Sequence, residues 1–414
     1  MVAEREGYDL VVLGSGAAGF AAAIRATELG AGVALVESAT VGGTCVNTGC
    51  IPSKAMLAPA DLLFRAGHHP FPGIATRADG VDLPALSAAR ADLVERLRRE
   101  RYLEVADGHG FGVLHGRARF EDASTIAIGG RRLSAGALVV ATGASPLLPP
   151  IEGLAEAAPL TTTTALELTE LPAELVVIGT GPSGLEMGQL LLHLGSRVTF
   201  LESEPRIAPA EEPETSDALR GALEDAGATV MTGVAITRVS REGGRRALTV
   251  EHDGWERTIG TDQVLVAAGR RPNSEDLEPT RAGIAVDARG ALWVDGALRT
   301  TNPRVWAAGD VTGHPQLVYL AAREGALAAS NALLGRAETL DLRALPRVIF
   351  TSPTAAAAGL TAAQAEEQGI ACDSRVLPMS AVPRAIVNRD TRGFVKLVAE
   401  VGTGRILGAS VVAE

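Results

Sequence analysis

The pattern of hydrophobic positions divides the first two thirds of the chain into two similar halves. An apolar run at residues 8–13 is followed by a glycine-rich turn, an alanine-rich helical stretch and a second apolar run at residues 33–36. The same order returns between residues 175 and 201. Uninterrupted apolar runs are typical of strands buried on both faces of a parallel sheet. The pattern therefore predicts an α/β fold with two Rossmann-like units.

The remaining pattern completes this architecture. It predicts helices over residues 51–64, 83–106 and 318–334, hairpin-like strands within residues 111–128, and buried strands at 139–143, 264–268 and 305–308. From residue 346 the sequence pattern changes and predicts an α+β segment. Its expected elements are strands at 348–350, 394–399 and 405–412 and a short helix capped by Thr361. We expect domains at residues 1–150 with 275–345, at 151–274, and at 346–414, the last one incomplete at its C-terminal end.

The two glycine-rich turns have the spacing of dinucleotide-binding fingerprints. In each, a Gly-x-Gly-x-x-Gly sequence follows a strand and opens a helix, and an acidic residue ends the next strand. The first glycine permits the tight turn, the second lets the backbone approach a pyrophosphate, and the third allows close packing of helix on strand. The two sets are Gly14, Gly16, Gly19 and Glu37, and Gly179, Gly181, Gly184 and Glu202. Two fingerprints predict two bound dinucleotides.

Two cysteines lie between the first unit and the helix predicted at residues 51–64. Cys50 would stand at the N-terminus of that helix, where the backbone dipole favours a thiolate, and Cys45 precedes it by five positions. A structural disulfide, half of a zinc site or two buried thiols are the alternatives. Zinc needs further ligands at suitable spacing, and the third cysteine, Cys372, has no histidine near it. We therefore favour a pair that handles electrons or a soft metal.

Charge and composition exclude several classes of function. A net charge of −11 and a pI near 5.3 make the chain a poor partner for nucleic acid or for an anionic membrane. No apolar run approaches the roughly 18 residues of a membrane helix, and no apolar signal region precedes the first strand. We expect a cytoplasmic protein that binds neither nucleic acid nor a membrane.

Together these motifs resemble the flavin-dependent pyridine nucleotide–disulfide oxidoreductases over essentially the whole chain. The likeness is carried by the cysteine box at residues 43–54, the Ala-Thr-Gly at 141–143, the second fingerprint with Glu186, the stretch 268–273 and the Ala-Gly-Asp at 308–310. Within the family, the stretches 316–322, 382–385 and 390–398 are most similar to mercuric reductases.

The resemblance implies FAD and either NADPH or NADH as cofactors. Beyond the glycines of the second fingerprint and Glu202, the residues that it assigns to cofactor binding are Gly14, Gly16, Ala18, Gly19, Glu37, Gly43, Thr44, Lys54, Ala118, Thr142, Gly143, Gly269, Asp310 and Val318. It also implies that Lys54 pairs with Glu186 beside the flavin, and that full-length relatives form homodimers.

The chemistry implied by the resemblance runs from nucleotide to metal. NAD(P)H reduces the flavin, the flavin opens a Cys45–Cys50 disulfide, and the dithiolate binds Hg(II) or thiol-bound Hg(II) transiently before Hg(0) leaves. Mercuric reductases continue past the equivalent of residue 414 with a segment that carries a further cysteine pair, and some begin with a metal-carrier module; we expect both to be missing here. A dihydrolipoamide dehydrogenase, another disulfide reductase, or an FAD-binding chain without turnover remain the alternatives.

Glu202 bears on the choice between the two nicotinamide cofactors. A carboxylate at this position can accept hydrogen bonds from both ribose hydroxyls of NADH and would repel the 2′-phosphate of NADPH. Mercuric reductases are described as using NADPH, and Arg206 could reach such a phosphate. We expect a preference for NADH of about ten- to a hundredfold.

Overall fold

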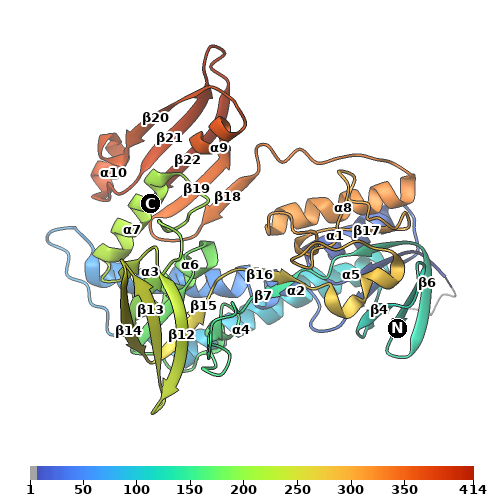
Figure 1. The fold of residues 1–414 in the computed structure, drawn as a ribbon, viewed down its shortest axis with the longest axis horizontal. Coiled ribbons are helices and arrows are strands. Elements are labelled where there is room, and N and C mark those ends of the chain that lie inside the picture. The colour runs from blue at the N-terminus through green and yellow to red at the C-terminus, as the bar shows by residue number, and fades with distance from the viewer. Residues whose placement is uncertain (1–6) are drawn as a thin grey trace. The chain divides into compact units, whose positions relative to one another are not determined.

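The structure is a computed structural model that describes residues 7–414 (Figure 1). The chain folds into two compact units. The first comprises the described part of Met1–Pro52 with Ala89–Ser145 and Arg270–Leu340, and the second comprises Ser53–Ala88, Pro146–Gly269 and Asp341–Glu414. The three-domain division at residues 150, 275 and 345 stays a prediction. Among the described residues, no helix is both long enough and apolar enough to cross a bilayer.

A parallel sheet forms the centre of the first unit. Its order is β3-β2-β1-β6-β17, with strands β1 (Tyr8–Leu13), β2 (Val33–Glu37), β3 (Gly112–His115), β6 (Arg131–Val140) and β17 (Val305–Ala307). The first half of β6 instead pairs antiparallel with β5 (Thr125–Ile128), which pairs with β4 (Ala118–Phe120). The expected hairpin at residues 111–128 was therefore only half right, because β3 joins the parallel sheet, where Val113 and Leu114 pack against the core.

Two helices of the first unit pack closely on each other. Helix α1 (Ala17–Glu28) lies against α8 (Val318–Leu334), and α8 also contacts β17 (Figure 1). A methyl group at Gly325 would stand 1.9 Å from the carbonyl oxygen of Ala18, so the two backbones meet directly. The helix expected at residues 83–106 is interrupted: α4 (Leu83–Arg98) gives way to a π-helical turn (Arg99–Leu103) and then α5 (Glu104–His109).

The second unit repeats the parallel arrangement and adds two antiparallel sheets. Its parallel sheet has the order β11-β10-β9-β15-β8 and carries α6 and α7. The bounds are β8 (Leu160–Thr161), β9 (Glu174–Ile178), α6 (Pro182–Leu194), β10 (Arg197–Leu201), α7 (Pro213–Asp225), β11 (Thr229–Met231) and β15 (Gln263–Val266). The antiparallel sheet β12 (Ala235–Glu242), β13 (Arg245–His252) and β14 (Trp255–Thr261) was not predicted.

The C-terminal segment forms the third sheet of this unit. Its order is β18-β19-β22-β21-β20, all antiparallel. The elements are β18 (Pro346–Ile349), β19 (Thr354–Gly359), α9 (Ala362–Glu367), β20 (Cys372–Pro378), α10 (Pro383–Asn388), β21 (Phe394–Glu400) and β22 (Ile406–Ala413). Thr361 caps α9 as expected, in a capping box with Gln364. The α+β character predicted from residue 346 is confirmed.

Candidate active site

The first glycine-rich loop is closed by the carboxylate at the end of β2. Oε2 of Glu37 accepts hydrogen bonds from the backbone N–H of Ser15 at 3.0 Å and from its hydroxyl at 2.5 Å. Ser15 Oγ in turn accepts the N–H of Gly42 at 3.0 Å, which links the loop to the cysteine segment. Helix α1 begins at the N-cap Gly16 without a side-chain cap. Its first amides therefore point toward the position expected for a pyrophosphate.

The second loop is closed in the same way. The N–H and hydroxyl of Thr180 donate to Oε2 of Glu202 at 2.9 and 2.6 Å. Burial works to raise the pKa of Glu202, but the hydrogen bonds from Thr180 and from the backbone of Glu204 outweigh it and lower the pKa. Helix α6 begins at the N-cap Gly181, again without a side-chain cap, and a methyl group there would meet no atom within 4 Å. This open space would let a ligand approach the backbone of Gly181 closely.

The cysteine pair lies on two consecutive helices, and both cysteines belong to the first unit. Cys45 is in α2 (Gly43–Asn47), and Cys50 is the first residue of α3 (Cys50–His68), as the sequence predicted. Both are half-buried and no disulfide joins them. The backbone of Gly43 touches that of Gly16, since a methyl group on Gly43 would stand 2.5 Å from the Gly16 Cα. The fingerprint loop and the cysteine segment are thus in direct contact.

Tyr102 lies within electrostatic range of the two cysteines. It sits in the π-helical turn after α4, a local distortion that is frequent at functional sites. Burial raises the pKa of its hydroxyl to about 12, and the charges of Cys45 and Cys50 add to that increase. The ring stands edge-on to Phe20 of α1, 4.8 Å between centroids. Tyr102 therefore stays a neutral hydroxyl that can donate a hydrogen bond near the thiols.

A carboxylate turn follows β17 in the same unit. Asp310 lies 3.8 Å from Arg270, and burial raises the pKa of Asp310 while it lowers that of Arg270. Arg270 Nε is buried without a hydrogen-bond partner in the structure. Behind the turn, Glu324 of α8 is fully buried; it accepts the N–H of Gly309 at 2.7 Å and contacts His314 Nδ1 at 2.6 Å. The buried polar atom of Arg270 is consistent with a ligand contact at this point.

In the second unit Lys54 and Glu186 form the ion pair expected from the sequence. Lys54 Nζ lies 2.5 Å from Glu186 Oε2, and Glu186 Oε1 accepts the N–H of Phe350 at 2.9 Å. The ammonium also stands 4.7 Å from the centre of the Phe350 ring, a cation–π contact. Glu186 is buried, so its charge needs this partner.

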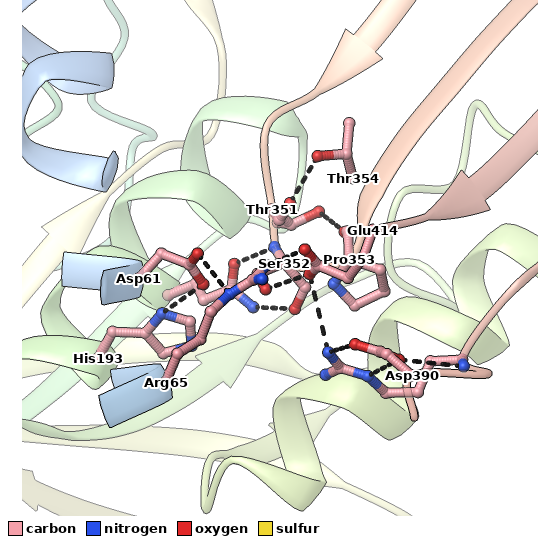
Figure 2. A network of polar contacts seen from close by, with 11 residues as sticks. Asp61, Arg65, His193, Thr351, Ser352, Pro353, Thr354, Asp390 and Glu414 are labelled. Atoms are coloured by element: carbon pink, nitrogen blue, oxygen red, sulfur yellow. Dashed lines mark hydrogen bonds and ion pairs between the residues drawn. The ribbon is translucent and has the colours of Figure 1, made fainter. Parts of the chain in front are cut away.

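The same faces of α3 and α6 continue into a larger polar network (Figure 2). Gln189, one turn after Glu186, accepts the N–H of Ser352 at 2.7 Å and donates to its carbonyl at 2.9 Å. Arg65 pairs with Asp61 at 2.7 Å and with Glu414. His193 is buried near Asp61, and this burial lowers its pKa to about 4, so its ring is neutral. The helix that starts at Cys50 is thus fixed, along its second-unit part, to α6 and to the C-terminal sheet.

The other residues predicted to bind cofactors occupy the ends of strands and helices. Thr142 and Gly143 follow β6, where Thr142 Oγ1 donates to the carbonyl of Asn273 at 2.7 Å. Ala118 begins β4, Val318 begins α8, and Ala18 and Thr44 lie in the first turns of α1 and α2. Gly269 follows β15 in the second unit. No contact described for these residues tests their binding roles, which remain predictions.

Sequence reasoning missed three kinds of site residue. Ser15 and Thr180 occupy the variable position inside each fingerprint, and their hydroxyls could have been recognised as partners of the acid 22 residues later. Arg270 belongs to a stretch that the sequence had singled out without giving the arginine a role. Tyr102 had no signal, because its place beside the cysteines depends on the packing of α1 against the π-helical turn.

In the described chain, no group of three or more His, Cys, Asp or Glu side chains is arranged to hold a metal ion.

Comparison with known proteins agrees with this geometry. Residues 8–325 match the family described as pyridine nucleotide-disulphide oxidoreductase, and residues 345–414 match its dimerisation domain. A mercuric reductase of Streptomyces lividans is 46% identical over 420 residues, 100% of this chain and 88% of that protein. One from Bacillus cereus is 44% identical over 407 residues, 98% of this chain; the chain spans 64% of that relative's length.

The solved structures give the same result. The HOCl-induced flavoprotein disulfide reductase RclA from Escherichia coli superposes with a TM-score of 0.86 at 31% identity, covering 98% of this chain and 90% of that one. The match to the family thus takes in both glycine-rich loops, the cysteine pair and the C-terminal sheet. Through these matches at residues 8–325 and 345–414, the chain belongs to the pyridine nucleotide-disulphide oxidoreductase family.

Proposed function

We propose that this protein uses a nicotinamide dinucleotide and FAD to reduce Hg(II) to Hg(0) at Cys45 and Cys50. The observation that carries the proposal is the position of Cys50 at the first residue of α3, with Cys45 on the preceding helix, in a chain similar to mercuric reductases over nearly its full length. Paired thiolates favour soft ions such as Hg(II). The substrate would be the free ion or a thiol-bound form of it.

The residues of the first unit fit FAD. The uncapped amides of α1 and the glycine backbone at residue 16 suit its pyrophosphate, and Asp310 and Gly43 lie on the elements that surround this loop. The other proposed contacts to FAD are Gly14, Gly19, Glu37, Thr44, Lys54, Ala118, Gly143 and Val318. Three further residues, Ala18, Thr142 and Gly269, are proposed to bind a cofactor without assignment to one of the two. When bound, the flavin supplies two-electron transfer between the nicotinamide and the cysteine pair.

The protein's own groups prepare this chemistry. The N-terminus of α3 stabilises the thiolate of Cys50, and a thiolate is the form that binds the metal. Tyr102, which stays protonated, can donate a hydrogen bond to a thiolate beside it. Lys54, one turn along α3, carries the positive charge that Glu186 holds in place. We place the reaction in the cytoplasm, where thiols stay reduced, and propose a homodimer through the segment that matches the dimerisation domain.

For the nucleotide we propose Gly179, Gly181 and Gly184 as the pyrophosphate site and NADH as the preferred form. Glu202 is buried and its lowered pKa keeps it charged, so it would repel a 2′-phosphate. Arg206, which could have neutralised that phosphate, is already used: its guanidinium donates to the carbonyls of Glu211 and Pro209, both at 2.7 Å. This engagement supports NADH over NADPH.

A second candidate is a disulfide reductase of other specificity. It is favoured by the likeness to RclA, a flavoprotein disulfide reductase of which a Cu(II) complex has been solved. This candidate shares the cofactors and the cysteine pair with the first and differs in the final electron acceptor.

The test compares acceptors in the purified flavoprotein. With excess thiol and Hg(II), NADH consumption should match the loss of mercury from solution as vapour, whereas lipoamide and small disulfides should give far slower turnover. Cys50→Ala or Cys45→Ala should lower kcat/KM for Hg(II) at least about a hundredfold. Cys372→Ala, on β20, is the matched control and should leave it unchanged. Rapid turnover of disulfides without mercury loss would favour the second candidate.

A further inference from the structure

Residues 203–212 contact both the second glycine-rich loop and the C-terminal sheet. This segment leaves the end of β10 at Glu202 and enters α7 at Pro213. The backbone N–H of Ala208 donates to the carbonyl of Thr180, inside the fingerprint, at 3.2 Å. Ile207 and Ala208 are almost completely buried. This segment, which we call the nucleotide loop, therefore lies directly on the loop that is proposed to hold the pyrophosphate.

The conformation of the nucleotide loop is not one that its sequence favours alone. Ala208 has φ of 43°, in the left-handed region that non-glycine residues rarely adopt. Such a conformation persists only where neighbouring groups hold it. Within the loop, the guanidinium of Arg206 bonds to two backbone carbonyls and to Ser216 Oγ at 2.8 Å. These contacts hold the loop as far as the backbone of Glu211 and leave the carboxylate of Glu211 to be paired from outside the loop.

The C-terminal sheet supplies that outside contact. Arg347 of β18 binds the carboxylate of Glu211 with both ends of its fork, Nε to Oε1 at 3.0 Å and Nη2 to Oε2 at 3.1 Å. The Glu211 N–H donates to the carbonyl of Ala208 at 2.9 Å, so a single hydrogen bond connects the ion-paired residue to the strained one. Bidentate pairing fixes direction as well as distance.

The neighbouring Glu212 is held just as firmly. Its carboxylate accepts the ammonium of Lys396 at 3.0 Å and the N–H of Ala362 at 2.8 Å. Burial acts to lower the pKa of Lys396, but the hydrogen bonds to Glu214 and Glu212 outweigh it and raise the pKa. Lys396 therefore fixes the last residue of the nucleotide loop to the first turn of α7, while Arg347 acts one residue earlier, on Glu211.

We propose that Arg347 is a positioning residue for the nicotinamide dinucleotide. Through Glu211 it holds the nucleotide loop against Thr180 and so sets the geometry of the site for the adenosine half of the cofactor. It acts from a strand outside the nucleotide-binding fingerprint and has no part in the electron-transfer step. The inference rests on the proposed function in one respect, namely that the second fingerprint binds NADH.

The test uses the purified holoenzyme and three measurements: the Kd of ADP-ribose, the steady-state constants for NADH, and the melting temperature. Arg347→Ala should raise the ADP-ribose Kd and the NADH KM about tenfold, with kcat at saturating NADH within about twofold of wild type. Arg347→Lys keeps the positive charge but cannot make the two-point contact with the carboxylate of Glu211. Its Kd and KM should lie between those of the wild type and those of Arg347→Ala. Arg343→Ala, four positions before Arg347, removes an exposed arginine that pairs with Asp341; it is the matched control and should change nothing.

A double-variant cycle separates positioning from general damage. Glu211→Gln should reproduce the effect of Arg347→Ala, and combining the two should add little to the Kd. An unchanged ADP-ribose Kd in folded Arg347→Ala would overturn the inference. So would a parallel fall of kcat, affinity and melting temperature in both Arg347→Ala and Arg347→Lys. Wild-type protein that binds neither ADP-ribose nor NADH would instead overturn the proposed function, and the inference with it.

Discussion

The two glycine-rich loops have the same internal construction and different surroundings. In each, a hydroxyl residue after the first glycine donates its N–H and its O–H to one oxygen of the glutamate 22 positions later: Ser15 to Glu37, and Thr180 to Glu202. In each, the following helix begins at a glycine without a side-chain cap. The similarity shows that the fingerprint specifies its own loop, and that the acid has a structural task besides any contact with ribose.

The difference lies in what each loop contacts next. Ser15 Oγ accepts the N–H of Gly42, so the first loop is tied to the segment that carries the cysteines. The carbonyl of Thr180 accepts the N–H of Ala208, so the second is tied to the nucleotide loop and, through Glu211, to the C-terminal sheet. One loop is thus coupled to the chemical groups of its own unit, and the other to the segment that matches a dimerisation domain.

The helices differ in the same sense. Helix α1 is built from small residues and packs backbone to backbone on α8, at Ala18 and Gly325. Helix α6 is buried from Gly184 to Leu194 and places three polar groups, Glu186, Gln189 and His193, along one face, where Lys54 and Ser352 are partners for the first two. The same glycine-rich motif can thus precede a helix that packs through close backbone contact, as α1 does, or one that packs through hydrogen bonds and an ion pair, as α6 does.

The largest expected effect comes from the third glycine of a fingerprint. In Gly184→Ala the added methyl group would stand 2.1 Å from the carbonyl of Gly179, a backbone atom that cannot move aside. We expect a loss of at least about 3 kcal/mol of stability, seen as a fall of several degrees in the melting temperature or as insoluble protein.

The second glycine provides the matched control. Gly181 has φ of −66° and no atom within 4 Å of an added methyl group, so Gly181→Ala should melt like wild type. The methyl group would instead occupy the space of the approaching pyrophosphate, and the NADH KM should rise about tenfold or more while flavin content stays constant. Normal NADH binding by Gly181→Ala would show that this loop does not hold the nucleotide.

We expect an intermediate effect when Glu202, the glutamate of the second fingerprint, loses its charge but keeps its shape. Glu202→Gln keeps an oxygen to accept from Thr180 and removes the repulsion toward a 2′-phosphate. The ratio of kcat/KM for NADPH to that for NADH should rise about tenfold. Glu37→Gln makes the same change in the first loop and should leave the ratio as it was. If both variants keep the wild-type ratio, Glu202 does not select the cofactor.

The sequence predicted the local units well because their determinants are local. The strands β1, β2, β9 and β10 and the helices that follow the fingerprints were placed to within one or two residues, since apolar runs and glycine spacing act over a few positions. Cys50 at a helix start and the pair of Lys54 with Glu186 were predicted as well, the latter through the family resemblance.

What the sequence did not reveal depends on contacts between distant segments. The sheet β12-β13-β14 was missed because its outer strands β12 and β14 bury few side chains, so no regular apolar pattern marks them in the sequence. The contacts of Arg206 could not be predicted either, since only the folded loop shows its guanidinium bound to carbonyls three and five residues away. The roles of Tyr102 and Arg347 likewise arise from packing across 50 to 136 residues of sequence, where no short pattern exists.

The smallest expected effect concerns Glu324 of α8, a fully buried carboxylate in the first unit. His314 contacts this buried carboxylate at 2.6 Å, and the hydrogen bond to Glu324 raises the pKa of His314 above its ordinary value. A raised pKa in the folded state means that the contact stabilises fully below the unfolded pKa near 6.5 and is lost as pH rises through the folded pKa. His314→Gln should therefore lower the melting temperature at pH 6 and much less at pH 9.

The magnitude should be modest, because His314 is about one third exposed and solvent screens the pair. We expect about 1 kcal/mol at pH 6, or one to two degrees in the melting temperature. Asp310, whose pKa is raised by burial, is present in both proteins, so its contribution cancels in the comparison. His115→Gln, at the exposed end of β3, should show no such pH dependence. An equal deficit at both pH values would mean that His314 contributes packing or a neutral hydrogen bond rather than its charge.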